Sequence, residues 1–427
     1  MYYLGYRIKE NLIQKRGENM AELQVKNFLY LLGSAVNTIN LNEKIENADW
    51  KAIFKYANEH NVTPLIFERA SQLDSFAESE CYNEVFLRSM NQVAEQTKNT
   101  QAFIELNKAF AHKNIFPIVM KGIVCRQMYG DLADLRPSGD EDILIKKEEF
   151  SIADKILREN GYIPEEREFN DEQLNKVQEI SYKSTKSSFY IELHINPMGN
   201  DNDFRDRMNA CFRHVFDDYI ELDANKITIR TMNHTDHFLF IILHALRHFT
   251  ASGFGVRQVL DILVYYRNYI DKINLKYIEE KLKEFDAWLF FNDLIHMGNE
   301  YMGFDLKAFE KPAVVEFLLD DLMHSGVFGN ETQAQRTASQ MTCAAVANKG
   351  KSENKLKIFI RTLFPSKEHF IDECPDIIQK PWLIVKLWIK RIFKFLRHSS
   401  QHKGNLVKES MDISQKRIEL LKEYKIL

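Results

Sequence analysis

Backbone-breaking residues are scarce along this chain, which has 16 glycines and 9 prolines in 427 residues. This is about half of the usual share, so it favours long helices over the many short strands and turns of a β-sandwich or barrel. Apolar residues make up 45% and charged residues 28%, as in folded globular proteins. A chain of this length is expected to form two or three packed units.

The helical pattern is interrupted by a central region that predicts a sheet. Short runs rich in apolar, β-branched and aromatic residues predict strands there. These runs lie at 116–120, 142–145, 187–195 and 226–231. Between the second and third runs, residues 146–162 are amphipathic and predict a helix that Gly161 ends. Strands that alternate with helices over about 80 residues indicate an α/β or α+β core.

The same patterns divide the chain into regions. The predicted regions are an extension at 1–20 that is in part disordered, an N-terminal helical region at 21–114, the core at 115–232, a helical domain at 233–323, and a linker with a basic, aromatic helical tail at 324–427. Within the extension, residues 1–19 precede Met20, which is a second candidate start of the protein.

Charge and cysteine content exclude several classes of protein. The net charge is −4, so the chain as a whole is not a basic nucleic-acid-binding protein. The five cysteines are scattered and form no CxxC pair, which argues against a disulfide framework and favours a reducing cytoplasm. No apolar run approaches the roughly 18 residues of a membrane span, and the first residues lack the apolar core of a secretory signal.

Polar motifs lie beside the first three predicted strands. They are, in chain order, Lys121-Gly122, Arg136, Asp140-Glu141-Asp142 and Glu192. Asp140 and Asp142 point to one face of a strand and Glu141 to the other. Two neighbouring carboxylates repel each other, and Mg²⁺ relieves this repulsion while it also binds substrate phosphates. This pattern indicates a metal site.

The residues around the acidic pair indicate phosphate chemistry. A third carboxylate from a neighbouring strand would allow a second metal ion to bind, and Glu192 is the best-placed candidate. Gly122 would let the backbone approach a phosphate. Lys121 and Arg136 would balance the phosphate charge.

The motifs together resemble a known family. The string VMKGIVCRQMYGDLADLRPSGDEDILI, followed by IELHI, is similar to the bacterial uncharacterised nucleotidyltransferase family of the DNA polymerase β-like superfamily. The match is close over about 117–195 and extends to the helical stretch 244–266. The family positions are filled by Lys121, Gly122, Tyr129, Arg136, Asp140, Asp142, Glu192 and His194, with Arg257 and Asp261 further along.

The resemblance implies an α+β, polymerase β-like core with a small mixed sheet, flanked by helical regions on both sides. It implies transfer of a nucleoside monophosphate from an NTP, with Mg²⁺ or Mn²⁺ held by Asp140 and Asp142. Glu192 would be a third ligand or the general base. The implied nucleotide-binding residues are Lys121, Gly122, Tyr129, Arg136, His194, Arg257 and Asp261.

The sequence departs from the family pattern at two positions. The usual Gly-Gly or Gly-Ser turn is replaced by Lys-Gly-Ile at 121–123, so the usual serine contact to phosphate is absent. Ile195 replaces an aromatic residue. Arg257 and Asp261 are four residues apart, so they could pair with each other instead of facing the nucleotide.

Two other functions remain open from the sequence. An Asp-x-Asp motif also occurs in metal-dependent glycosyltransferases that use nucleotide sugars, although these have a longer doubly wound sheet ahead of the motif. The chain could also be a non-catalytic nucleotide- or partner-binding module. The acceptor could be a small molecule, a sugar, RNA or a protein.

The tail contains one further feature. Residues 380–398 interleave aromatic and basic residues and contain no acidic residue. They predict a helix that contacts a membrane surface or a nucleic acid, or one that packs with its basic side in water.

Overall fold

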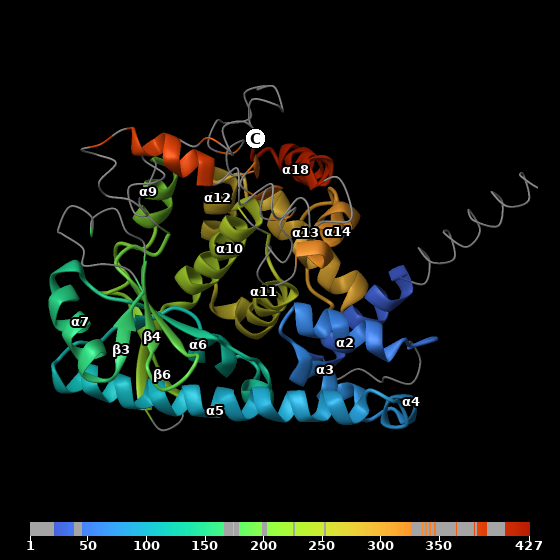
Figure 1. Ribbon diagram of the computed structural model, residues 1–427, viewed down its shortest axis with the longest axis horizontal. Coiled ribbons are helices and arrows are strands. Elements are labelled where there is room, and N and C mark those ends of the chain that lie inside the picture. Colours follow the sequence, from blue (N-terminus) through green and yellow to red (C-terminus); the bar gives the residue numbers. More distant parts are fainter. Residues whose placement is uncertain are drawn as a thin grey trace, which may run out of the picture. The chain divides into compact units, whose positions relative to one another are not determined.

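The computed structural model (Figure 1) describes residues 21–37, 45–165, 174, 179–198, 203–224, 227–251, 253–325, 335, 338, 339, 341, 342, 346, 364, 380, 382–390 and 406–427. The predicted extension at 1–20 lies outside these residues, as does much of the predicted linker and tail. The chain forms two compact units. The first comprises Met1–His244, Arg257–Phe285 and Leu294–Ala308, and the second comprises Ala245–Val256, Asp286–Asp293 and Phe309–Leu427.

Seven strands of the first unit form one mixed sheet in the order β3-β4-β5-β2-β1-β7-β6. The strands are β1 (Ile118–Val119), β2 (Asp140–Leu144), β3 (Tyr162–Pro164), β4 (Glu179–Ser184), β5 (Tyr190–His194), β6 (Tyr219–Ala224) and β7 (Ile227–Met232). The pairs β2–β5 and β1–β7 are parallel and the other pairs are antiparallel. The prediction of an α+β fold with a mixed sheet is confirmed.

The four predicted strands correspond to β1, β2, β5 and β7, whereas β3, β4 and β6 were not predicted. β3 has only three residues, and β4 and β6 contain several polar or charged residues. Such strands gain their stability from pairing with neighbours rather than from their own apolar pattern. The predicted helix at 146–162 is a 3-10 turn, η3 (Lys147–Glu149), followed by α7 (Phe150–Glu159), and Gly161 follows with a φ of +83°.

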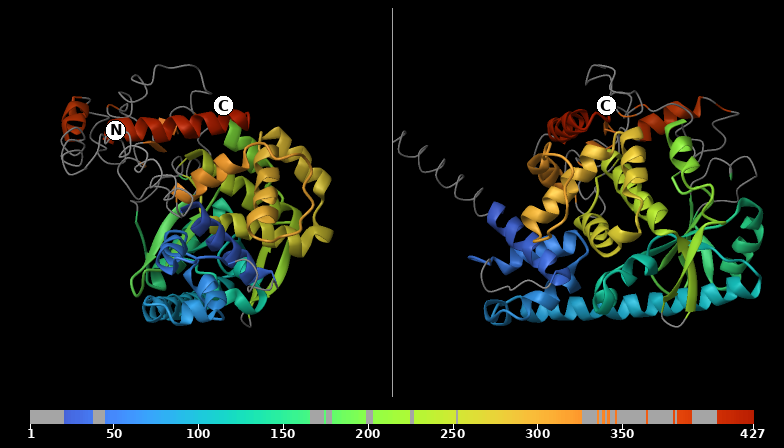
Figure 2. Two further views of the ribbon diagram at one scale, coloured as in Figure 1. Left: turned by 90° about the vertical axis from the view of Figure 1, so that its right-hand side faces the viewer. Right: turned by 180° about the vertical axis from the view of Figure 1, so that it is seen from behind.

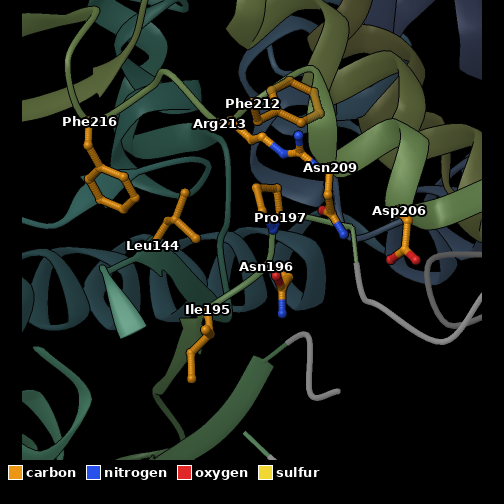
Figure 3. A pocket seen from close by; sticks show the side chains of 9 residues that line it. All are labelled: Leu144, Ile195, Asn196, Pro197, Asp206, Asn209, Phe212, Arg213 and Phe216. Atoms are coloured by element: carbon orange, nitrogen blue, oxygen red, sulfur yellow. The ribbon is translucent and has the colours of Figure 1, made fainter. Parts of the chain in front are cut away.

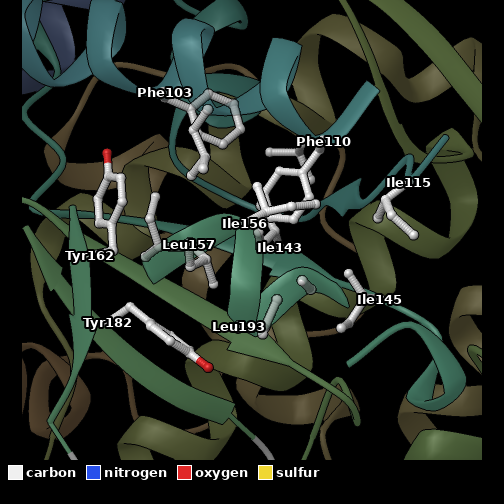
Figure 4. Packing of buried hydrophobic residues seen from close by; sticks show 14 of the residues in the cluster. Phe103, Phe110, Ile115, Ile143, Ile145, Ile156, Leu157, Tyr162, Tyr182 and Leu193 are labelled. Carbon is white, nitrogen blue, oxygen red and sulfur yellow. The ribbon is translucent and has the colours of Figure 1, made fainter. Parts of the chain in front are cut away.

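One face of the sheet carries the hydrophobic core of the first unit. Figure 4 shows Ile143 of β2 and Leu193 of β5 packed beneath Phe103 and Phe110 of α5 (Tyr82–His112). Ile156 of α7 belongs to the same cluster. The views in Figure 2 show the long helix α5 running past the sheet. Since side chains alternate along a strand, the even-numbered residues of β2 and β5 point to the opposite face.

Helices make up the rest of the first unit. A helix at 21–36 precedes α2 (Trp50–Glu59), α3 (Thr63–Ala70), α4 (Asp74–Ala77) and α5, and the first strand follows only at Ile118. This order differs from the doubly wound sheet expected ahead of the motif in a glycosyltransferase. The other elements wholly within this unit are α6 (Ile123–Gln127), η2 (Gly130–Leu135), α9 (Asp203–Ala210), η4 (Ile270–Lys272) and α12 (Leu275–Glu284).

Three helices contain residues of both units: α10 (His234–Ala251), α11 (Val256–Tyr269) and α13 (Trp288–Tyr301). Within the second unit, α14 (Val315–Ser325) packs with α18 (Leu406–Glu423). Tyr424 donates a hydrogen bond of 2.8 Å to buried Asp293. Among the helices of the described residues, none is both long enough and apolar enough to cross a membrane.

Candidate functional site

The parallel pairing of β2 with β5 brings the acidic residues together. Asp140 lies opposite Tyr190, Asp142 opposite Glu192 and Leu144 opposite His194. These residues share the face of the sheet that points away from the α5 core. Their register is set by long-range pairing, which joins positions about fifty residues apart.

Asp142 is fully buried at the centre of the site. His194 Nε2 lies 3.1 Å from Asp142 Oδ1 and 3.8 Å from Glu192 Oε2. One ligand atom from each of Asp142, Glu192 and His194 lies within 4.8 Å of the others. Lys121 follows β1 by two residues, and its Nζ lies 3.1 Å from Asp142 Oδ2. Asp140 is partly exposed and belongs to no such three-residue group among the described residues.

The charges of the site are strongly coupled. Burial by itself would raise the pKa of Asp142, but the Lys121 ammonium and His194 hold it well below its usual range. Burial would lower the pKa of His194, but its contacts with Asp142 and Glu192 raise it to about 9. Burial and then the charge of Asp142 raise the pKa of Glu192 to about 7. Lys121 and His194 therefore balance the carboxylates at neutral pH.

Glu141 points to the other face, as the strand alternation predicts, but its role was not foreseen. One carboxylate oxygen accepts a hydrogen bond of 2.7 Å from the backbone N–H of Ile123, and the other lies 3.3 Å from Arg126 Nη2. Burial raises the pKa of Glu141 to about 7. Glu141 thus fastens the start of α6 to β2. A charged residue between core positions of a strand signals such a partner, although the sequence does not say which one.

Gly122 has a different environment from the one that the sequence suggested. Its φ is +59°, and an added Cβ would lie 1.9 Å from Glu141 Oε2. The space that the absent side chain leaves is therefore occupied by Glu141, and not held open for a phosphate. The glycine is required by the turn and by the close approach of this carboxylate.

Three of the expected nucleotide-binding residues, Tyr129, Arg136 and Asp261, form a buried network. Arg136 donates hydrogen bonds of 2.7 and 2.5 Å to the two carboxylate oxygens of Asp261, and the Tyr129 hydroxyl donates one of 2.7 Å to the same carboxylate. Arg257 instead donates to the Pro137 carbonyl at 2.5 Å. The alternative that Arg257 and Asp261 pair with each other is therefore wrong, because Asp261 binds Arg136 across 125 positions.

This network fixes the loop that leads into β2. Arg136 is 4% exposed, so both members of its ion pair are taken out of water. Such a pair is costly to break, because a single remaining partner would be a buried, uncompensated charge. In this conformation the Arg136 guanidinium is engaged with Asp261.

Two other residues near the site are not among the site residues predicted from the sequence. His237 of α10 is buried, and its Nε2 donates to the Met120 carbonyl at 2.7 Å, directly before Lys121. Burial lowers the pKa of His237 to about 4, so it is neutral at pH 7. Glu179 of β4 is the pairing partner of His194, and its Oε2 lies 3.6 Å from His194 Nε2.

A cavity of about 420 Å³ begins where β2 and β5 end. Leu144, two residues after Asp142 in β2, and Ile195, which directly follows His194 at the end of β5, both line it (Figure 3). The aromatic rings of Phe212 and Phe216 and the Arg213 guanidinium also line it. The cavity has space for a small molecule beyond the ends of the two strands that carry Asp142 and Glu192, although neither carboxylate lines it.

Comparison with known proteins gives one match. A family model described as an uncharacterised nucleotidyltransferase matches residues 46–303, which is more than half of the chain. No curated protein and no solved structure matches.

Proposed function

The chain belongs to the uncharacterised nucleotidyltransferase family, and on this premise we propose that it moves a nucleoside monophosphate from an NTP to an acceptor hydroxyl and releases pyrophosphate. The finer fold that we propose is a polymerase β-like core. The observation that carries the proposal is the convergence of Asp142, Glu192 and His194 on one face of two parallel strands, with potential ligand atoms within 4.8 Å.

The donor set fits a hard divalent cation. The carboxylates of Asp142 and Glu192 converge, and Asp140 lies two residues before Asp142 on the same face of the sheet. Carboxylate oxygens are the ligands that Mg²⁺ and Mn²⁺ prefer. Asp140, Asp142 and Glu192 would hold the metal, which would neutralise the triphosphate and acidify the attacking hydroxyl. The pKa of Asp142 lies well below its usual range, so this carboxylate is ionised and ready to bind a cation.

The residues of the chain would perform the remaining steps. Lys121, whose Nζ lies 3.1 Å from Asp142 Oδ2, would contact the triphosphate. Glu192, with a pKa of about 7, would accept the proton of the acceptor hydroxyl. The acceptor oxygen would then form a bond to the α-phosphorus, and the bond from that phosphorus to the bridging oxygen would break as pyrophosphate leaves.

The buried network and the turn would act by positioning. Tyr129, Arg136 and Asp261 would hold the loop that leads to the acidic strand, and Arg257 would hold the same loop through Pro137. Gly122 would allow Glu141 to fix Lys121 beside Asp142. His194 would orient Asp142. Positioning of this kind contributes much of the catalysis in phosphoryl transfer.

We propose that the acceptor binds in the cavity beyond β2 and β5. The proposed acceptor classes are small molecules, sugars, the ends of RNA and protein side chains. A reducing cytoplasm is the proposed location. The buried, free thiols of Cys81, Cys125 and Cys211 support this location.

The test is transfer of label from each of the four NTPs, labelled at the α-phosphate, in the presence of cell extract and Mg²⁺. We expect labelled product with the wild-type chain and none with Asp142→Asn, because the amide is a poor ligand for Mg²⁺. The matched control is Asp223→Asn on β6, which changes an exposed aspartate of the same sheet. Wild-type transfer by Asp142→Asn would refute the assignment.

A thermal-shift series separates the other functions. We expect NTPs with Mg²⁺ to raise the melting temperature more than nucleotide sugars do. A shift with nucleotide sugars alone would favour a glycosyltransferase. A shift with NTPs but no labelled product with any extract would favour a non-catalytic nucleotide-binding module.

A further inference from the structure

The helix at 383–390 has an unusual distribution of side chains for the surface of a globular unit. Its exposed residues include Trp382 at the start (66% exposed), Val385 (51%) and Ile389 (49%). At about 100° per residue, these three positions and Lys386 and Lys390 occupy one continuous arc of about 140°. The exposed side is thus an apolar stripe with two lysines along one border.

The other side of this helix is also apolar. Leu383, Ile384, Leu387 and Trp388 are partly buried, and the Trp388 ring packs edge-on against Phe364 at 5.5 Å between ring centroids. The helix therefore packs on one side within the second unit and presents a second apolar side to the solvent. A surface helix normally has a polar outer side, so this stripe requires an explanation.

The chemistry of the stripe favours lipid over nucleic acid. Val385 and Ile389 have branched aliphatic side chains, which neither stack on bases nor bind phosphates. Aliphatic side chains do insert between acyl chains, and tryptophan prefers the boundary between headgroups and hydrocarbon. Residues 380–398 contain six lysines and arginines and no acidic residue, so the charge of this segment complements an anionic headgroup layer.

We propose that the helix at 383–390 docks the protein on an anionic lipid surface. Trp382, Val385 and Ile389 would enter the boundary region, and Lys386 and Lys390 would contact the headgroups. In this arrangement the helix would lie along the membrane surface. This inference does not depend on the proposed transferase activity.

The test is co-sedimentation of the full chain with vesicles of phosphatidylcholine alone or with about one-third phosphatidylglycerol. We expect binding to the anionic vesicles only. The paired change Lys386→Gln and Lys390→Gln should reduce partitioning by about fivefold for each lysine. The paired change Val385→Asp and Ile389→Asp should abolish it, because the apolar stripe is lost.

The control is Leu87→Asp on α5, which introduces an aspartate at another exposed apolar side chain (61% exposed) and should leave binding unchanged. A second measurement does not depend on the aspartate variants. Brominated lipids should quench the tryptophan fluorescence of the bound protein, and most of that quenching should be lost in Trp382→Phe. Absence of binding to anionic vesicles would overturn the proposal. So would binding that both paired variants retain, or binding of single-stranded RNA in place of vesicles.

Discussion

Substitution of Gly122 by alanine should destabilise the first unit through two separable effects. The first is backbone strain, because a φ of +59° costs a non-glycine residue about 1–3 kcal/mol. The second is displacement of Glu141, whose Oε2 would lie 1.9 Å from the new Cβ. The carboxylate must then give up its hydrogen bond from Ile123 N and its contact with Arg126. Leaving such buried groups unsatisfied costs about 1–3 kcal/mol more.

The chain contains matched controls for both effects. Gly130 also has a positive φ, +56°, but an added Cβ would meet nothing within 4 Å, and Gly139 has open space without a positive φ. We therefore expect Gly139→Ala to be neutral or stabilising by up to about 1 kcal/mol. Gly130→Ala should cost the strain alone, about 1–3 kcal/mol. Gly122→Ala should cost about 2–6 kcal/mol in total, which is about 1–3 kcal/mol more than Gly130→Ala.

The assay is urea unfolding of the three variants, followed by circular dichroism and compared with the wild type. The paired change Arg126→Met and Glu141→Ala removes the groups that Gly122 accommodates, so Gly122→Ala in that background should cost no more than Gly130→Ala does in the wild type. If Gly122→Ala is no more costly than Gly130→Ala in the wild-type chain, the close approach of Glu141 does not explain this glycine.

Two further predictions concern buried ionisable side chains. His60 and His237 are buried, and burial lowers the pKa of each to about 4 from the usual 6.5. The unfolded chain therefore binds more protons between these values, so stability is full above pH 6.5 and is lost as the pH falls toward 4. Each histidine should lower the free energy of unfolding by roughly 2–3 kcal/mol between pH 7 and pH 4.5. Urea unfolding at both pH values should show a smaller decrease for His60→Gln than for the wild type. An equal decrease in the two proteins would contradict the prediction. Asp261→Asn should destabilise the first unit by about 3–5 kcal/mol, because it leaves the Arg136 guanidinium buried without its counter-charge. Thermal unfolding of this variant should be compared with Asp271→Asn on exposed η4, and similar melting temperatures for the two would show that the network carries little stability.

Local patterns in the sequence identified much of the sheet and of its acidic face. Short β-branched and aromatic runs located β1, β2, β5 and β7, because strands buried on at least one face need such residues. Alternation along a strand placed Asp140 and Asp142 on one face and Glu141 on the other. The polar strands β4 and β6 were not predicted, because they are stabilised by pairing with neighbouring strands and not by their own composition.

The sequence by itself determined on which face of a strand each charged residue lies. Side chains alternate between the two faces along a β-strand, so position alone gives their direction. Only the tertiary structure decided which distant groups meet. The partnership of Arg136 with Asp261 spans 125 positions, and the parallel register places Glu192 beside Asp142. Strand order and the desolvation of buried charges select these partners, and both are properties of the assembled unit. The same cause explains Gly122, whose need for glycine arises from a carboxylate nineteen positions along the chain.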